Sequence, residues 1–245
     1  MVNVAVVGAR GYLGRELVRL LSGHPKVEAL TLTSTSEAGK PYGELVPAFR
    51  HRRDLIMAAP AKAGDADVVF IATDGEEAKK SVADLGERPK LLVDLSRAHR
   101  HAAFEKDSGW SYGLSEFFPV VKGTKRIANP GCYPTATMVA AGAALRSGLA
   151  ADGVLIADGK SGVSGAGASP RGDLHYPEMN EAVRAYKVLG HDHLGEIRLA
   201  ANAASGAKGA ARAVRFTPHL VPMSRGLLST VYLPAKPGVT AEQAK

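Results

Sequence analysis

The 245-residue sequence is short of sulfur and of aromatic side chains: it has one cysteine and one tryptophan, and aromatic residues make up 6% of it. One cysteine excludes an internal disulfide framework and is typical of a reducing compartment, so we expect a cytoplasmic location. No apolar run approaches the roughly 20 residues of a membrane-spanning helix. Residues 1–7 have a strand-like pattern without the basic segment of a signal peptide. The composition predicts one large or two small globular domains and no membrane partner.

Acidic residues are outnumbered: 24 Asp and Glu against 31 Lys and Arg give a formal net charge of +7. Binding to nucleic acid would require basic residues clustered together with aromatic ones. The basic residues are scattered instead, and the only short cluster, residues 49–53, fits a solvated loop or strand edge. An anionic substrate or cofactor explains the charge equally well, so we expect no nucleic-acid partner.

A glycine-rich turn follows the first apolar run, residues 4–7, which has the pattern of a strand buried on both faces. Residues 16–21 then show helical spacing. In such a strand–turn–helix, the first glycine permits a tight turn, the second lets the backbone approach a pyrophosphate, and the third lets the helix pack on the strand. A plain glycine-rich turn is the alternative. The spacing favours a dinucleotide-binding loop with these contact residues: Gly8, Arg10, Gly11, Tyr12, Leu13 and Gly14.

The second expected strand, residues 27–33, ends where dinucleotide-binding domains usually carry an acid for the ribose. Here the chain reads Thr33-Ser34-Thr35-Ser36, with Lys40 beyond and no acid before Glu37. Hydroxyls and a cation suit a 2′-phosphate, which a carboxylate would repel. A simple Ser/Thr-rich loop is the alternative. We therefore predict NADP as the cofactor, contacted by Thr33, Ser34 and Ser36.

A polar and basic run, residues 94–100, follows a further expected strand at residues 90–96. Ligands bind at the carboxyl ends of strands in open α/β sheets. Arg100 is a candidate for binding an anion, because its planar guanidinium matches phosphate or carboxylate. The alternative is an ordinary surface arginine.

The single cysteine, Cys132, lies directly after Asn129-Pro130-Gly131 and before an apolar run at residues 137–145. Asn, Pro and Gly each favour a turn, which places the thiol at or near the start of a helix. Helix-terminal amides stabilise a thiolate, and a thiolate is an activated nucleophile. The alternative is a small buried hydrophobic residue.

The second half combines an expected strand at residues 153–158, a loop with four glycines at residues 159–167, and two late strands at residues 214–223 and 227–233. The loop is either a flexible linker or a close-approach ligand loop. Strands that crowd late, after β-α-β units, indicate a second domain of α+β type. The sequence thus predicts a Rossmann-type domain over residues 1–131 and an α+β domain over residues 132–245.

Two histidines, His191 and His193, could bind a metal on a strand. Their spacing is wrong for a helical pair and no third ligand lies nearby, whereas a cysteine nucleophile needs a base. We therefore predict no metal.

Seven segments, in order over nearly the whole chain, together resemble the N-acetyl-γ-glutamyl-phosphate reductase family of arginine biosynthesis, which is related to aspartate-semialdehyde dehydrogenase. The cysteine block and the block that begins at Phe216 are specific, whereas the glycine loop alone is not. The resemblance implies a fold like that of glyceraldehyde-3-phosphate dehydrogenase and a homo-oligomer, dimer or tetramer. The segments are residues 8–14, 94–100, 112–114, 129–136, 159–167, 190–193 and 216–226.

The resemblance further implies the reduction of an acyl phosphate to an aldehyde by NADPH. Cys132 would expel phosphate to form a thioester, which hydride would convert to a thiohemiacetal and then to the aldehyde. His191 or His193 would be the acid/base residue, and the sequence does not choose between them. Phosphate or oxyanion contacts would come from Arg100, Asn129 and the Ser161-Gly162 loop, which we also expect at the cofactor.

The chain departs from the family pattern at Arg97-Ala98-His99, at Thr73-Asp74-Gly75 and at Asp192. The family also continues beyond Lys245 with a segment that returns to the nucleotide domain, so we expect the second domain to be truncated. Two rival functions stay open: a reductase of carrier-bound aminoadipyl phosphate in lysine biosynthesis, and a non-catalytic dinucleotide sensor.

Overall fold

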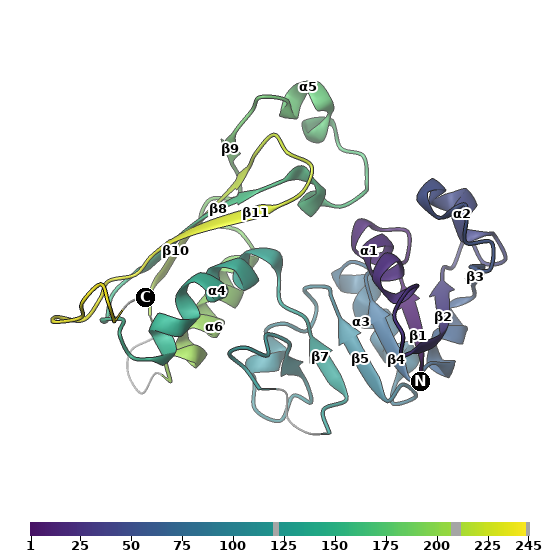
Figure 1. Cartoon of the computed structure of the whole chain (residues 1–245), viewed down its shortest axis with the longest axis horizontal. Helices are drawn as coiled ribbons and strands as arrows, with labels where there is room; N and C mark the ends of the chain where they lie inside the picture. Colours follow the sequence, from purple (N-terminus) through teal and green to yellow (C-terminus); the bar gives the residue numbers. More distant parts are fainter. Residues whose placement is uncertain (120–122, 207–211, 244–245) are drawn as a thin grey trace. The chain divides into compact units, whose positions relative to one another are not determined.

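The computed structural model describes residues 1–119, 123–206 and 212–243 (Figure 1). The chain forms two compact units, Met1–Gly113 with Val120–Asn129, and Leu114–Pro119 with Pro130–Lys245. The boundary after Asn129 lies two residues before the predicted one. Residues 114–119 join the second unit because the ring of Phe117 packs against Gly142, where a Cβ would lie 2.3 Å from a ring carbon.

The first unit is built around a parallel seven-stranded sheet of order β3-β2-β1-β4-β5-β7-β6. Helices connect most of its strands, as in the predicted Rossmann-type α/β fold, which is confirmed. The elements are β1 (Val2–Val7), α1 (Tyr12–Leu21), β2 (Val27–Thr33), α2 (Tyr42–Leu45), β3 (Met57–Ala58), β4 (Val68–Ile71), α3 (Gly75–Leu85), β5 (Leu91–Asp94), β6 (Ser111–Tyr112) and β7 (Arg126–Ala128).

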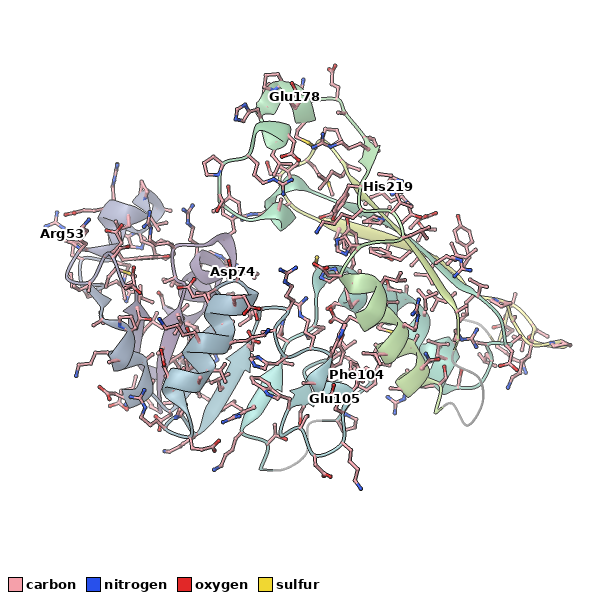
Figure 2. The ribbon with its side chains drawn as sticks, turned by 180° about the vertical axis from the view of Figure 1, so that it is seen from behind. Arg53, Asp74, Phe104, Glu105, Glu178 and His219 are labelled. Carbon is pink, nitrogen blue, oxygen red and sulfur yellow. The ribbon has the colours of Figure 1, made fainter. Side chains whose placement is uncertain are left out.

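Both faces of this sheet are covered by helices. Successive side chains of β1 point to opposite faces: Ala5 packs in a cluster with Val82 of α3, and Val6 packs in another with Val18 of α1. This two-sided burial explains why residues 4–7 are apolar without alternation. Asp74, which Figure 2 labels, is the N-cap of helix α3, and its side chain accepts a 3.4 Å hydrogen bond from the main-chain amide of Glu77.

The second unit has a mixed four-stranded sheet of order β11-β8-β10-β9. Alternate residues of β8 and β10 are buried on the side where α4 and α6 pack, and Figure 1 shows these two helices side by side. The sheet and its helices form the predicted α+β arrangement. The elements are α4 (Cys132–Arg146), β8 (Leu155–Ser161), α5 (Tyr176–Met179), β9 (Arg184–Ala185), α6 (His193–Ala204), β10 (Val214–Leu220) and β11 (Leu227–Tyr232).

Short 3-10 turns complete the two units, at Pro47–Phe49, Pro60–Asp65, Ala102–Phe104, Val163–Ala166 and Gly172–Leu174. Within the described ranges, no helix is both long and apolar enough to cross a membrane.

Candidate active site

The glycine turn of the first unit has one glycine for each of the three expected roles. Gly8 has φ +83°, and a Cβ there would lie 2.7 Å from the Ala72 carbonyl oxygen. A Cβ on Gly14 would lie 2.2 Å from the Gly8 carbonyl oxygen, so the helix needs glycine to pack on the strand. Among the described residues, a Cβ on Gly11 would meet nothing closer than 3.6 Å. Space is therefore left at Gly11, the N-cap of α1, for an external ligand.

This turn fits the pyrophosphate of a dinucleotide. The amides of the first turn of α1 follow Gly11, and no side chain among the described residues caps them. Tyr12 and Leu13 are exposed beside the turn, as is the side chain of Arg10. All six residues predicted to bind the cofactor thus lie in the turn after β1 or in the first turn of α1.

The hydroxyl residues at the end of β2 and just after it differ in their exposure and hydrogen bonds. Thr33 is 2% exposed, so its side chain belongs to the protein interior. Ser34 accepts a 3.3 Å hydrogen bond from the Glu37 amide, and Ser36 is exposed. The carboxylate of Glu37 pairs with Arg10 of the glycine turn at 2.9 Å and with Lys40 at 2.6 Å. Sequence reasoning passed over this acid, because its position four residues after the strand concealed the ion pairs.

The loop after β5 is organised by a buried carboxylate. Asp94 is fully buried and accepts hydrogen bonds from the Ser96 amide at 2.8 Å and hydroxyl at 3.0 Å. Its Oδ2 also lies 2.7 Å from Nδ1 of His99, whose ring stacks on Trp110 with 4.0 Å between centroids. Asp94 and His99 therefore form a partly buried aspartate–histidine pair.

Arg100 lies in the same loop after β5. It is only 8% exposed, so it is not an ordinary surface arginine. Its Nε donates to the Asn129 carbonyl at 3.0 Å, and its Nη2 donates to the Leu95 carbonyl at 2.9 Å. The main-chain N–H of Asn129 in turn donates to the main-chain carbonyl of Asp94 at 2.8 Å. The two predicted phosphate-binding residues, Arg100 and Asn129, are thus bonded to each other within the first unit.

The candidate nucleophile lies in the second unit, where Cys132 is the first residue of α4 and is exposed. The alternative of a packed hydrophobic residue is excluded by this exposure. Gly131, the N-cap of α4, is buried, and its amide donates to Oε1 of Glu196 at 2.9 Å. The main-chain amides of the first turn of α4 point toward its N-terminal end, where Cys132 lies, and there they stabilise a negative charge.

A pocket of about 510 Å³ in the second unit brings several predicted residues together. Three cations, Arg171, Arg184 and Lys187, line it with Asp173, which pairs with both arginines, at 2.7 and 3.5 Å. This lining suits an anionic ligand. The predicted site residues that line the same pocket are Cys132, Ser161, His191 and His193.

His191 lies two residues before α6 and His193 is its first residue, so neither lies on the strand that the rejected metal hypothesis assumed. The amide of His193 donates to Nδ1 of His191 at 3.1 Å, and the two rings lie 4.7 Å apart. In the neutral ring the proton of His191 is therefore on Nε2. Burial, and then the positive charge of Lys187, lower the pKa of His191, while Asp192 partly opposes this. His191 thus stays neutral at pH 7. Among the described residues, no three His, Cys, Asp or Glu side chains could hold a metal ion.

The glycine-rich loop after β8 is a fixed part of the pocket and not a flexible linker. A Cβ on Gly162 would lie 2.9 Å from backbone atoms of Met223, Ser224 and Arg225, and the Gly162 amide donates to the Gly226 carbonyl at 3.0 Å. Ser161, 5% exposed, donates its hydroxyl to the Gly162 carbonyl at 3.0 Å. The close approach of the backbone at residues 223–225 therefore explains why position 162 is glycine, without a ligand.

Two pocket tyrosines were not foreseen. Tyr133 donates its hydroxyl at 3.0 Å to the carbonyl of His219, which Figure 2 labels on β10, and accepts a 3.4 Å hydrogen bond from Tyr186. Burial first, and then Tyr186, raise the pKa of Tyr133 well above its usual range. Both tyrosines also contact the ring of His191 edge-on. The sequence signal was their position, directly after Cys132 and shortly before His191.

Comparison with known proteins matches both units. Residues 3–122 match the family model "Semialdehyde dehydrogenase, NAD binding domain", and residues 132–245 match "Semialdehyde dehydrogenase, dimerisation domain". The N-acetyl-gamma-glutamyl-phosphate reductase of Syntrophobacter fumaroxidans is 40% identical over 259 residues, covering 99% of this chain and 74% of the relative. That of Heliobacterium modesticaldum is 39% identical, covering 100% and 76%. The chain thus spans about three quarters of each relative.

Solved structures show the same fold at low identity. Aspartate semialdehyde dehydrogenase II from Vibrio cholerae has a TM-score of 0.75 at 18% identity, covering 99% of this chain and 77% of that one. Aspartate semialdehyde dehydrogenase from Candida albicans, solved with NADP, has a TM-score of 0.73 at 17% identity, covering 99% and 74%.

Proposed function

The chain belongs to the N-acetyl-gamma-glutamyl-phosphate reductase family, and we propose that it reduces N-acetyl-γ-glutamyl phosphate to the semialdehyde and phosphate, with NADPH as the hydride donor, in arginine biosynthesis. One observation carries the proposal: an exposed thiol at a helix N-terminus shares a pocket with two imidazoles and three cations. Such a pocket suits an anionic acyl substrate and nucleophilic catalysis. We also propose a cytoplasmic location, where an exposed thiol stays reduced.

The thiolate of Cys132 attacks the acyl carbon of the substrate. The S–C bond forms, the C–O bond to phosphate breaks, and phosphate leaves with the electron pair. First-turn amides of α4 stabilise the attacking thiolate, and the cations of the pocket hold the anionic substrate. When bound, the dinucleotide supplies a hydride to the thioester carbon. The resulting oxyanion then collapses to the aldehyde and returns the thiolate of Cys132.

His191 is the hydrogen-bond donor to the acyl oxygen in this proposal. Its Nδ1 is occupied by the His193 amide, so a neutral ring offers an Nε2 proton, and its lowered pKa keeps the ring neutral at pH 7. That proton stabilises the oxyanion on the acyl oxygen. His193, the other imidazole that lines the pocket, accepts the proton of the thiol and passes it to the departing phosphate.

The remaining predicted ligands take supporting roles. Ser161 lines the pocket near the substrate. Arg100 and Asn129 stay candidates for phosphate binding, because two backbone carbonyls hold the guanidinium of Arg100 in one place.

We propose a homodimer formed by the outward face of the second sheet. The support is the dimerisation-domain match over residues 132–245, together with exposed apolar side chains on neighbouring strands. Ile156 of β8 lies opposite Tyr232 of β11 in the ladder, and Leu228 lies four register positions further along the pair, on the same face. All three side chains are exposed although they are large and apolar.

The test is the reverse reaction, with semialdehyde, phosphate and NADP, catalysed by wild type and by Cys132→Ser. We expect the variant to lose at least about 10³-fold in kcat, because the alcohol is a far weaker nucleophile than the thiolate. The variant should still bind NADP, which shows that it is folded. Equal rates in the two proteins, or no activity in either, would exclude the catalytic role. Forward activity on free substrate without a carrier protein would exclude the lysine-pathway rival.

A further inference from the structure

A closed ion triad lies beside the expected cofactor site of the first unit. Glu37 Oε1 lies 2.9 Å from Arg10 Nη1, and Glu37 Oε2 lies 2.6 Å from Lys40 Nζ. The carboxylate side chain is 15% exposed, whereas those of the arginine and lysine are 51% and 56% exposed. The acid thus sits beneath the two cations, which face solvent.

The triad occupies the place where this type of sheet recognises the ribose next to adenine. Arg10 belongs to the glycine turn after β1, and Glu37 follows β2. These two strands are parallel neighbours, and Val7 pairs with Thr33 at their carboxyl ends. In such folds a carboxylate here accepts the ribose 2′-hydroxyl of NAD, and a cation here binds the 2′-phosphate of NADP. This chain has both kinds of group, paired with each other.

The turn that carries Glu37 is anchored on both sides. The Ser34 hydroxyl accepts from the Glu37 amide at 3.3 Å, and the Lys40 amide donates to the Glu37 carbonyl at 3.1 Å. The Ser34 amide donates to the Ala58 carbonyl at 3.0 Å, and the Met57 amide donates to the Lys40 carbonyl at 2.9 Å. Strand β3 therefore holds the carboxylate in reach of both cations. Lys40 also lowers the pKa of Glu37, so the side chain is charged at pH 7.

We infer that Glu37 competes with the 2′-phosphate of NADP for Arg10 and Lys40, and thereby sets how strongly this chain prefers NADP over NAD. Binding of NADP exchanges the carboxylate for the phosphate on both cations. Binding of NAD leaves both ion pairs of Glu37 intact, and the 2′-hydroxyl of NAD donates a hydrogen bond to the carboxylate. The inference rests on the proposed function, because it takes a nicotinamide dinucleotide as the ligand of this loop.

The test measures the Kd of NADP and of NAD by isothermal titration calorimetry, without substrate, on the full chain at low salt. We expect Glu37→Gln to bind NADP about three- to tenfold more tightly, the amount that two exposed ion pairs contribute. Its affinity for NAD should be unchanged or weaker. In Lys40→Met the gain from Glu37→Gln should shrink, which a double-mutant cycle detects. The gain should also decrease at high salt.

The matched control is Glu44→Gln, an exposed carboxylate in the same segment. It removes the same charge but makes no ion pair among the described residues, so neither Kd should change more than about twofold. The inference is overturned if Glu37→Gln leaves NADP affinity unchanged or weaker, or shifts both cofactors in parallel. Those results leave the reductase proposal intact if wild type still reduces the acyl phosphate. Failure of wild type to bind either cofactor would remove both proposals.

Discussion

The buried carboxylate of Glu196 accepts a 2.9 Å hydrogen bond from the amide of Gly131, the residue before the candidate nucleophile. Glu196 is 2% exposed and lies on α6, three residues after His193. One helix thus carries an imidazole of the pocket and the acceptor that fixes the turn of Cys132. The sulfur and the imidazole are therefore positioned through a common element.

Glu196→Ala should destabilise the second unit and lower kcat. The substitution leaves a buried amide without its acceptor, which costs about 1–3 kcal/mol. Urea unfolding measures the stability, and the reverse reaction measures kcat. Glu196→Gln keeps an oxygen acceptor and should retain most of both. The control is Glu178→Ala, an exposed acid on α5 that Figure 2 labels. Equal stability of Glu196→Ala and Glu178→Ala would contradict the positioning role.

Gly11→Ala and Gly14→Ala should separate ligand binding from folding. A Cβ at position 11 is in ordinary contact with the protein, at 3.6 Å, so thermal stability should hold while dinucleotide affinity falls at least about tenfold. A Cβ at position 14 would lie 2.2 Å from a carbonyl oxygen and should cost about 1–3 kcal/mol of stability. Differential scanning calorimetry and cofactor titration give the two readouts. A Gly11→Ala protein that binds the dinucleotide normally would refute the loop assignment.

Substitution of two charged neighbours should shift the pKa of His191 in opposite directions. Lys187 lowers the pKa of His191 and Asp192 raises it, after the larger effect of burial. Lys187→Gln should therefore move the His191 titration to higher pH, and Asp192→Asn should move it to lower pH. In wild type the midpoint should lie below the ordinary value of about 6.5. NMR titration of the imidazole signals measures all three. Shifts of the same sign in both variants would rule out this account.

Tyr232→Glu should weaken self-association. The side chain is exposed on edge strand β11, and a charge there opposes burial of an apolar face against a second copy. Light scattering over a dilution series should show a dimer in wild type and a shift toward monomer in the variant. Val139→Glu, at another exposed apolar position on α4, serves as the control and should leave the dimer unchanged. Equal dissociation in both variants would argue against the sheet-face dimer.

The sequence correctly predicted the elements that depend on residues adjacent in the chain. Breakers before Cys132 placed it at a helix start, and it is the first residue of α4. The spacing of Gly8, Gly11 and Gly14 indicated a strand–turn–helix, which the structure contains. Helix α6 was missed because Gly195 and the pair of histidines weaken the helical pattern in its first turn, while its stability comes from packing against α4 and β10.

The sequence by itself determined the two fold types, the family and the place of the lone cysteine at a helix start, because strand and helix periodicity, turn residues and motif blocks are written in short stretches of chain. Only the tertiary structure decided which groups act on one another. It joined Glu196 to Gly131, Glu37 to Arg10, and Gly162 to the turn at residues 223–225. These partners lie 27 or more residues apart, so their hydrogen bonds, charges and close contacts exist only once packing has brought the backbones together.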